Sequence, residues 1–202
     1  VLTGTRATAA PTRGLTIDDM LAMQRIDEPA VSPDGRHVAF SVRDTDFDGN
    51  RGRVDVWMAG VDGRNPKRLT TDRQNDQSPV WSPDGKYIAY VSWTEDGGDI
   101  WRIAADGGRP EKLTTQSAYY DDIMYSANGT RIVAARAPRT QRAIVNDEIN
   151  PKLVLTDLVW IPATGGAASY ITALTNAGRP HFTRDSSRIW LYEGGDGLVS
   201  MR

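Results

Sequence analysis

The stretch whose residue types come nearest to a metal site is an acidic segment, DTDFDGNRGRVD, at residues 44–55. Three aspartates alternate with other residues before a glycine, and a fourth stands at the end of the segment. Hard oxygen ligands at this spacing can wrap one calcium ion if the segment curls. A solvated hairpin loop is the competing interpretation, because the last ligand is aspartate rather than the longer glutamate. The predicted calcium ligands are Asp44, Asp46, Asp48 and Asp55.

A second group of polar residues lies just ahead of a turn that recurs along the chain. The segments 27–31, 77–81, 121–125 and 178–182 read as short strands, and they carry most of this group. If such strands line a channel, their carboxylates favour cationic or amine-bearing ligands, although solvation of acidic side chains explains them equally well. The predicted channel-lining residues are His181, Arg179, Asp121, Asp122, Asp76 and Glu28, with Asp27 beside them.

Catalytic chemistry is not visible in the sequence. The chain has no cysteine, which excludes disulfides, thiolate nucleophiles and cysteine-bound zinc. It has two histidines, His37 and His181, no H-x-H pair and no G-x-S-x-G segment. We therefore expect no catalytic residue in this chain and no cofactor other than the candidate calcium ion.

Composition excludes further classes. With 24 basic and 26 acidic residues the formal net charge is −2, so no concentrated basic surface for nucleic acid is expected. No apolar run approaches the roughly 20 residues that a membrane helix needs. Residues 1–14 read as a flexible leader, in which ATA at 7–9 fits the end of an export signal. A periplasmic or secreted location is the expectation, and a cytoplasmic one is the alternative.

The elements that must position these residues come from an internal repeat. SPDG occurs at 32–35 and at 82–85, and weaker copies follow as SANG at 126–129 and TRDS at 183–186. Each copy is followed by an alternating apolar strand. After the first three copies come a second strand with an acidic–apolar–tryptophan signature (DVW, DIW, DLVW), a glycine turn and a further strand. The copies of the turn are unequally spaced because the hairpin loop between the first two of these strands varies in length. The predicted units are 27–71, 77–115, 121–173 and 178–202, within a domain at 15–202.

Four strands per unit favour a β-propeller. Pro29, Pro79 and Pro180 all stand three residues ahead of the turn, and proline cannot donate to a strand ladder, so these strands belong at a sheet edge. The innermost strand of a propeller blade is such an edge. The fold class is therefore all-β, an incomplete propeller of four-stranded antiparallel blades with three blades and part of a fourth. The tryptophans are expected to pack between blades.

One short helix is predicted, at residues 17–24. Thr16 is a suitable N-cap, and Asp19 stands where a capping box needs its acidic partner. We expect this helix to pack against the propeller.

The frame SPDG…DIW…DGG…LT, over residues 30–202, resembles the TolB-type propeller repeat. Within it, LTIDDMLAMQRIDEPAVSPDGRHVAFSV at 15–42 and NRGRVDVW at 50–57 (residues 15–75 overall) resemble the opening propeller of prolyl-oligopeptidase-family serine peptidases. IAYVSWTEDGGDIWRI at 88–103 and RPHFTRDSSRIWLYEGGDGLVSMR at 179–202 (residues 80–202 overall) are similar to the propeller of certain bacterial amidohydrolases.

These resemblances imply an accessory role. The first expectation is a non-catalytic propeller segment of a larger secreted serine peptidase, which gates or orients peptide-like substrate for a hydrolase domain in the same chain. The alternatives are the propeller of an amidohydrolase and a TolB-like protein-binding module with no enzyme attached. A peptide or protein ligand is expected, and the isolated fragment is expected to self-associate, because its last blade would leave strand edges and apolar faces uncovered.

Overall fold

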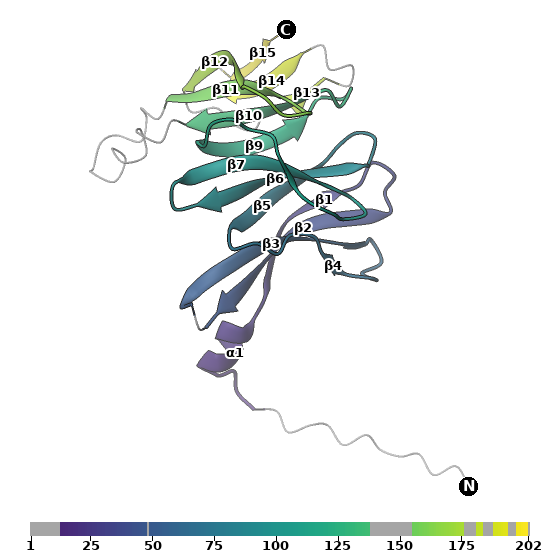
Figure 1. Ribbon diagram of the computed structural model, residues 1–202, viewed down its shortest axis with the longest axis vertical. Coiled ribbons are helices and arrows are strands. Elements are labelled where there is room, and N and C mark those ends of the chain that lie inside the picture. Colours follow the sequence, from purple (N-terminus) through teal and green to yellow (C-terminus); the bar gives the residue numbers. More distant parts are fainter. Residues whose placement is uncertain are drawn as a thin grey trace.

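A computed structural model describes residues 13–47, 49–137, 155–175, 181–183, 188–193 and 197–201. Across these ranges the secondary structure is antiparallel sheet, apart from the short helix α1 (Ile17–Ala22). The strands form three four-stranded sheets and one three-stranded sheet. Figure 1 shows the sheets stacked in chain order along the long axis of the molecule. The expected incomplete propeller of four-stranded blades is confirmed.

The strands of each blade pair in the order in which they occur in the chain. Blade 1 contains β1 (Arg25–Val31), β2 (His37–Asp46), β3 (Arg51–Gly60) and β4 (Lys67–Arg68). Blade 2 contains β5 (Asn75–Trp81), β6 (Tyr87–Thr94), β7 (Gly97–Ala104) and β8 (Glu111–Lys112). Blade 3 contains β9 (Tyr119–Tyr125), β10 (Arg131–Ala137), β11 (Leu155–Pro162) and β12 (Ser169–Thr175). Blade 4 contains β13 (His181–Phe182), β14 (Ile189–Glu193) and β15 (Gly197–Met201).

The repeated turn joins the first two strands of a blade through a local network of hydrogen bonds. In blade 1 the Gly35 N–H donates to the Ser32 carbonyl at 2.9 Å, and Gly35 takes a φ of 70°, which glycine adopts without steric cost. The Ser32 hydroxyl donates to Asp34 Oδ1 at 2.6 Å and accepts the His37 N–H at 2.9 Å. The serine, aspartate and glycine of the turn therefore each make a hydrogen bond within it.

The same network recurs in later blades, which explains why the turn motif is repeated in the sequence. The Ser82 hydroxyl donates to Asp84 Oδ1 at 2.6 Å, and the Ser126 hydroxyl donates to Asn128 Oδ1 at 2.8 Å. Asparagine thus serves as well as aspartate, because only the acceptor oxygen is used. In blade 4 the Thr183 hydroxyl accepts the Arg188 N–H at 3.1 Å.

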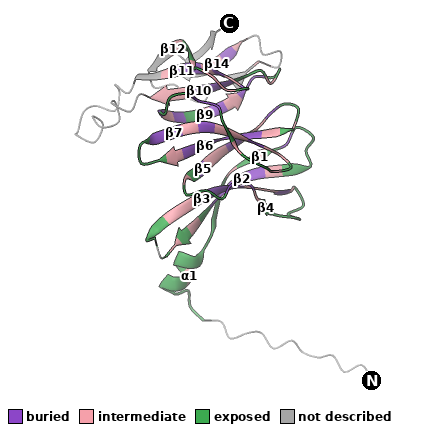
Figure 2. Cartoon of the chain, in the orientation of Figure 1, coloured by how far each residue is buried: buried purple, intermediate pink, exposed green. Residues whose placement is uncertain are grey.

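Apolar side chains between neighbouring sheets form the core. Figure 2 shows buried residues along the strands in the middle of the stack. Between blades 1 and 2 the buried cluster is Ala39, Val56, Leu69, Ile88, Tyr90 and Ile103. Trp101 packs against this cluster, and Trp160 packs against the cluster of Val133, Leu158 and Ile189 between blades 3 and 4. The predicted packing of the tryptophans between blades is confirmed for these two.

The far face of blade 1 is more exposed than the equivalent faces of the next blades. Val31, which precedes the first turn, is 61% exposed, whereas Tyr125, at the equivalent position of blade 3, is 7% exposed. Tyr125 is covered by blade 2, and among the described residues no blade covers Val31. This open face is what an incomplete propeller must have.

Helix α1 has the predicted N-terminus but only part of the predicted packing. Thr16 and Asp19 form the capping box in both directions. The helix ends at Ala22 rather than at residue 24, because Met23 is already extended, with ψ of 124°, and leads into β1. None of its residues is buried, and Ile17 is 75% exposed. The expected packing of the helix on the propeller is met only in part: α1 contacts β2, and Met20 and Leu21 line a cavity with Arg43 and Thr45 of blade 1, but no helix side chain is buried. No helix among the described residues is long and apolar enough to span a membrane.

Replacing Ser82 with alanine tests the turn network. Ser82 is 5% exposed and its hydroxyl makes two hydrogen bonds, so Asp84 Oδ1 and the Tyr87 N–H would each lose a partner. We expect Ser82→Ala to lower the free energy of unfolding by about 1–3 kcal/mol, measured by urea denaturation. Ser117→Ala is the matched control, because Ser117 donates only an exposed hydrogen bond to Asp99. Equal effects of the two substitutions would contradict the role assigned to the turn.

Candidate functional site

The first strands of the blades share a structural irregularity. Strands β1, β5 and β9 contact one another in succession and form what we call the inner edge. The pairing of each with its neighbour is interrupted by a bulge at the same place, four residues before the first residue of the turn. There Glu28, Ser78 and Asp122 take positive φ values of 52°, 56° and 49°. Non-glycine residues rarely adopt this conformation, and bulges of this kind redirect side chains.

Hydrogen bonds across the blades hold the first two bulges together. Glu28 accepts the Ser78 N–H at 2.6 Å and the Ser78 hydroxyl at 2.8 Å. It also accepts the Ser41 hydroxyl of its own blade at 2.9 Å. One carboxylate therefore joins three donors from two blades, and charge-assisted bonds of this kind are among the stronger ones. Glu28 therefore holds the inner strands of blades 1 and 2 against each other.

The bulges border a cavity of about 350 Å³. Its lining combines carboxylates with proline and aliphatic side chains from all three inner strands, including Glu28, Pro29, Ser78, Pro79, Asp121 and Asp122. Asp121 is exposed, and its carboxylate accepts the Asp122 N–H at 2.9 Å. Because Asp121 is open to solvent while Glu28 is engaged, Asp121 is the side chain best placed to meet a ligand. The cavity can hold an apolar group beside a positive one.

The predicted channel-lining residues separate into three groups. Glu28, Asp121 and Asp122 are brought together in this cavity. His181 lies in β13, but its side chain is outside the described part of the structure, as is Arg179. Asp76 does not line the cavity, because it is fully buried, so its assignment as a channel residue was wrong. Sequence position alone put it on the inner strand, where the alternation of the strand turns it toward blade 1.

Asp76 is a buried carboxylate whose oxygens lack a hydrogen bond of good geometry, although the hydroxyls of Ser92 and Thr70 lie near it. It pairs in register with Ser92 on β6 and is 0% exposed. Neither of its oxygens accepts a hydrogen bond from the described residues. Burial raises the pKa of Asp76 to about 6, and the nearby charge of Asp72 adds to the rise, while the hydroxyls of Ser92 and Thr70 oppose it. The carboxyl group therefore takes up a proton near neutral pH.

The acidic segment 44–55 forms a hairpin in the structure. Asp44 and Asp46 lie on β2 opposite Arg53 and Arg51 of β3, so the segment does not curl around a centre. Asp55 is buried and accepts a hydrogen bond from Arg68 at 2.5 Å. No three potential ligands converge among the described residues, and Asp48 lies outside them. The described part of the chain gives a calcium ion no support.

Sequence reasoning missed Ser78. Ser78 is neither charged nor aromatic, yet it stands at the second bulge and donates hydrogen bonds to Glu28 of the neighbouring blade. The available signal was its position, because Glu28, Ser78 and Asp122 all stand four residues before a turn serine. Aligning the repeats on the turn would have identified it.

Comparison with known proteins adds three findings. A family model described as TolB beta propeller domain matches residues 22–158. Dipeptidyl-peptidase 5 of Porphyromonas gingivalis is 32% identical over 78 residues, which are 39% of this chain and 11% of that protein. The structure of TolB from Acinetobacter baumannii matches with a TM-score of 0.65 and 21% identity. The match covers 86% of this chain and 40% of the TolB chain.

A peptidase structure shows the same fold. The acylaminoacyl peptidase of Pyrococcus horikoshii has a TM-score of 0.60 and 15% identity, covering 91% of this chain and 33% of its own. At these identities the structural similarities show the fold alone. The chain spans about a tenth of the curated peptidase in the matched region and well under half of either structure.

Substituting Asp76 tests the buried carboxyl group. Its pKa is about 6 in the folded state against 3.8 ordinarily, so ionisation costs the folded state stability as the pH rises between these values. The penalty is absent below the lower value and complete above the upper one. We expect Asp76→Asn to raise the free energy of unfolding by about 2 kcal/mol at about pH 8 and to change it little at about pH 4. Urea denaturation at both pH values measures this. A stabilisation equal at both would show that ionisation is not the cause.

Proposed function

The chain belongs to the TolB β-propeller family, and from this membership we propose that it is the non-catalytic propeller segment of a larger exported peptidase. The observation that carries the proposal is the sequence similarity to dipeptidyl-peptidase 5. A serine peptidase of the prolyl-oligopeptidase type fits the order of elements, in which a short helix precedes the first blade. The hydrolase domain would lie in the same polypeptide and would supply the nucleophile, since this chain contains no G-x-S-x-G segment.

We assign the inner-edge cavity the role of orienting peptide-like substrate. Apolar lining from Pro29 and Pro79 suits a side chain, and the exposed carboxylate of Asp121 suits an amine. The propeller would thereby favour peptides of one orientation before they reach the hydrolase domain. The absence of cysteine is compatible with the proposed export.

A TolB-like binding module is the second candidate. The fold similarity to TolB from Acinetobacter baumannii favours it, because TolB shares the propeller. In that case the inner-edge cavity would take a segment of a partner protein and no hydrolase domain would follow. No relative reported above is an amidohydrolase, so that alternative keeps only its resemblance at residues 80–202.

Labelling of the full-length protein with a fluorophosphonate tests the peptidase proposal. The reagent reacts with an activated serine nucleophile. We expect the full-length protein to be labelled, and the 202-residue chain alone to remain unlabelled. Heat-denatured full-length protein is the control for nonspecific reaction. A full-length protein that binds a protein partner but takes no label would replace the peptidase proposal with the binding module.

Replacing Asp121 with asparagine tests the role of the cavity. The substitution removes the exposed charge and keeps the shape of the side chain, so the Asp122 N–H keeps its acceptor. In the full-length enzyme we expect KM for a peptide with a free amino terminus to rise about fivefold, with kcat unchanged. An N-acetylated copy of the same peptide should show no change. Asp18→Asn, on the exposed helix α1, is the matched control. A fall in kcat without a change in KM would argue against an orienting role.

A further inference from the structure

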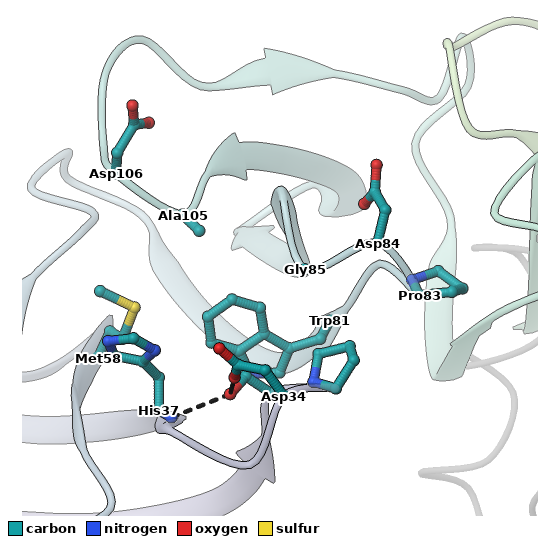
Figure 3. Close-up of a pocket in the computed structure, with 11 residues that line it drawn as sticks. Asp34, His37, Met58, Trp81, Pro83, Asp84, Gly85, Ala105 and Asp106 are labelled. Atoms are coloured by element: carbon teal, nitrogen blue, oxygen red, sulfur yellow. Dashed lines mark hydrogen bonds between the residues drawn. The ribbon is translucent and has the colours of Figure 1, made fainter.

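A second cavity, of about 420 Å³, lies between the repeated turns of blades 1 and 2. Figure 3 shows the Trp81 ring in the centre, with His37 and Met58 on one side and Pro83, Asp84 and Gly85 on the other. Asp34 and Asp106 also line it. Three aspartates and one aromatic ring therefore line the same cavity, and Figure 3 shows Asp34 beside the ring. It is distinct from the inner-edge cavity, whose lining residues are different.

Blades 2 and 3 enclose a cavity built from the equivalent positions of the repeat. Tyr87 replaces His37, Arg102 replaces Met58, and Tyr125 replaces Trp81. Arg102 and Met58 are equivalent because each directly follows the tryptophan of the third strand of its blade. The chain therefore contains two versions of one cavity, which can be compared directly.

A guanidinium group occupies the cavity between blades 2 and 3. The Arg102 Cζ lies 4.4 Å from the centroid of the Tyr87 ring, a cation–π distance. Its Nη1 donates to the Ala163 carbonyl at 2.7 Å, across to blade 3. Its Nε and Nη2 donate to Glu111 at 2.8 Å and 2.6 Å. The chain's own arginine thus satisfies the acceptors of this junction.

The cavity between blades 1 and 2 lacks this arginine and has more carboxylates. Met58 stands in place of Arg102 and brings no charge. Asp84 occupies the position that Asn128 holds in the other cavity, and Asp106 occupies that of Thr164. The cavity between blades 2 and 3 sets Arg102 against one lining carboxylate, that of Asp84, whereas the cavity between blades 1 and 2 has three lining carboxylates and no lining lysine or arginine among the described residues. This excess of negative charge leaves room for a cation that comes from elsewhere.

The groups around this cavity are held in place for a cation. The Trp81 Nε1–H donates to the Ala30 carbonyl at 2.9 Å, which orients the ring. Asp34 uses Oδ1 for the Ser32 hydroxyl, and this bond, followed by that from the Arg36 N–H, lowers the pKa of Asp34. For its Oδ2 the structure records no partner among the described residues. Asp34 is therefore an ionised group with a free oxygen.

Two lysines approach the rim without filling the cavity. Lys86 Nζ is 3.9 Å from Asp84 Oδ2, and the Lys86 side chain is 75% exposed, so this pair contributes little. Lys67 Nζ donates to the backbone carbonyl of Asp106 at 2.5 Å, not to the carboxylate of Asp106. Neither lysine lines the cavity.

We propose that the cavity between the turns of blades 1 and 2 binds an arginine side chain presented by another polypeptide. The guanidinium stacks on Trp81 and meets the carboxylates of Asp34 and Asp84. Arg102 makes the same two kinds of contact at the next junction, but its aromatic partner Tyr87 is equivalent to His37 rather than to Trp81. The Ala105 carbonyl, equivalent to that of Ala163, is the backbone acceptor. This site is independent of the function proposed for the inner edge.

Fluorine NMR of fluorotryptophan-labelled full-length protein tests the proposal, with the Trp81 signal assigned through Trp81→Phe. The probe is N-acetyl-L-arginine amide, and N-acetyl-L-citrulline amide is its neutral match. We expect saturable movement of the Trp81 signal with the arginine probe and at least about tenfold weaker binding of the citrulline probe. Equal binding of the two probes, or no saturable movement with either, would overturn the proposal.

Two substitutions sharpen the test. Met58→Arg copies the arginine of the next junction, so it should fill the cavity and weaken probe binding at least about tenfold, whereas Met58→Leu should leave binding unchanged. Asp34→Asn should weaken binding about fivefold. It should preserve the turn, because Asn128 makes the same bond to its turn serine at 2.8 Å. The signals of the other tryptophans report whether each variant is folded. A folded Met58→Arg protein that binds the probe like the wild type would show that the cavity is not the site.

Discussion

Blades 2 and 3 carry buried apolar side chains on both faces of their sheets, and such a sheet needs a neighbour on each side to keep both faces from water. Strand β6 shows the constraint most clearly. Ile88 and Tyr90 point into the cluster shared with blade 1, while Ala89 and Val91 point into the cluster shared with blade 3, and none is more than 1% exposed. Stacking follows from this two-sided pattern. The arrangement of turns, edges and polar groups follows from the stacking, because every blade then presents the same element at the same place.

Stacking also decides which polar groups are available for binding. At the inner edge the bulges turn Glu28 and Asp122 toward a shared cavity, and Glu28 is satisfied by donors from two blades. Two residues before Ser78 on the same inner strand, Asp76 faces the neighbouring blade and is buried without a hydrogen bond of good geometry. The depth of a side chain between the blades therefore separates a group that can meet a ligand from one that can only be desolvated. The inner edge is thus functional in part and structural in part.

Repetition lets the molecule serve as its own comparison. The two cavities between successive turns are built from equivalent positions, so their differences stand out from the shared architecture. Arg102 in one and Met58 in the other change the local charge, and the surrounding carboxylates change in the opposite sense. A difference confined to one junction is not needed for packing, since both junctions pack. Asp34 and Asp84 serve their own turns, and the binding proposed above would give these carboxylates a second role beside Trp81.

The sequence by itself determined the fold class. Alternation set the strands, the repeated turn set the blades, and Pro29 and Pro79 placed the first strand of each blade at an edge, because these features depend on neighbours within a few residues. The capping box of α1 was equally local. The candidate site was only partly predictable. Glu28, Asp121 and Asp122 were predicted on the inner strands and line one cavity there, whereas Ser78 was not predicted and Asp76 is buried outside that cavity.

The tertiary structure decided which of these side chains meet. The pairing of Asp55 with Arg68, the bridge from Glu28 to Ser78 and the burial of Asp76 all depend on the register and the stacking of sheets. A one-residue bulge changes the side of a strand on which every later side chain lies, and no local pattern in the sequence marks its position. Contacts between blades join residues about 50 positions apart, as Glu28 and Ser78 show, so only the folded arrangement can specify them.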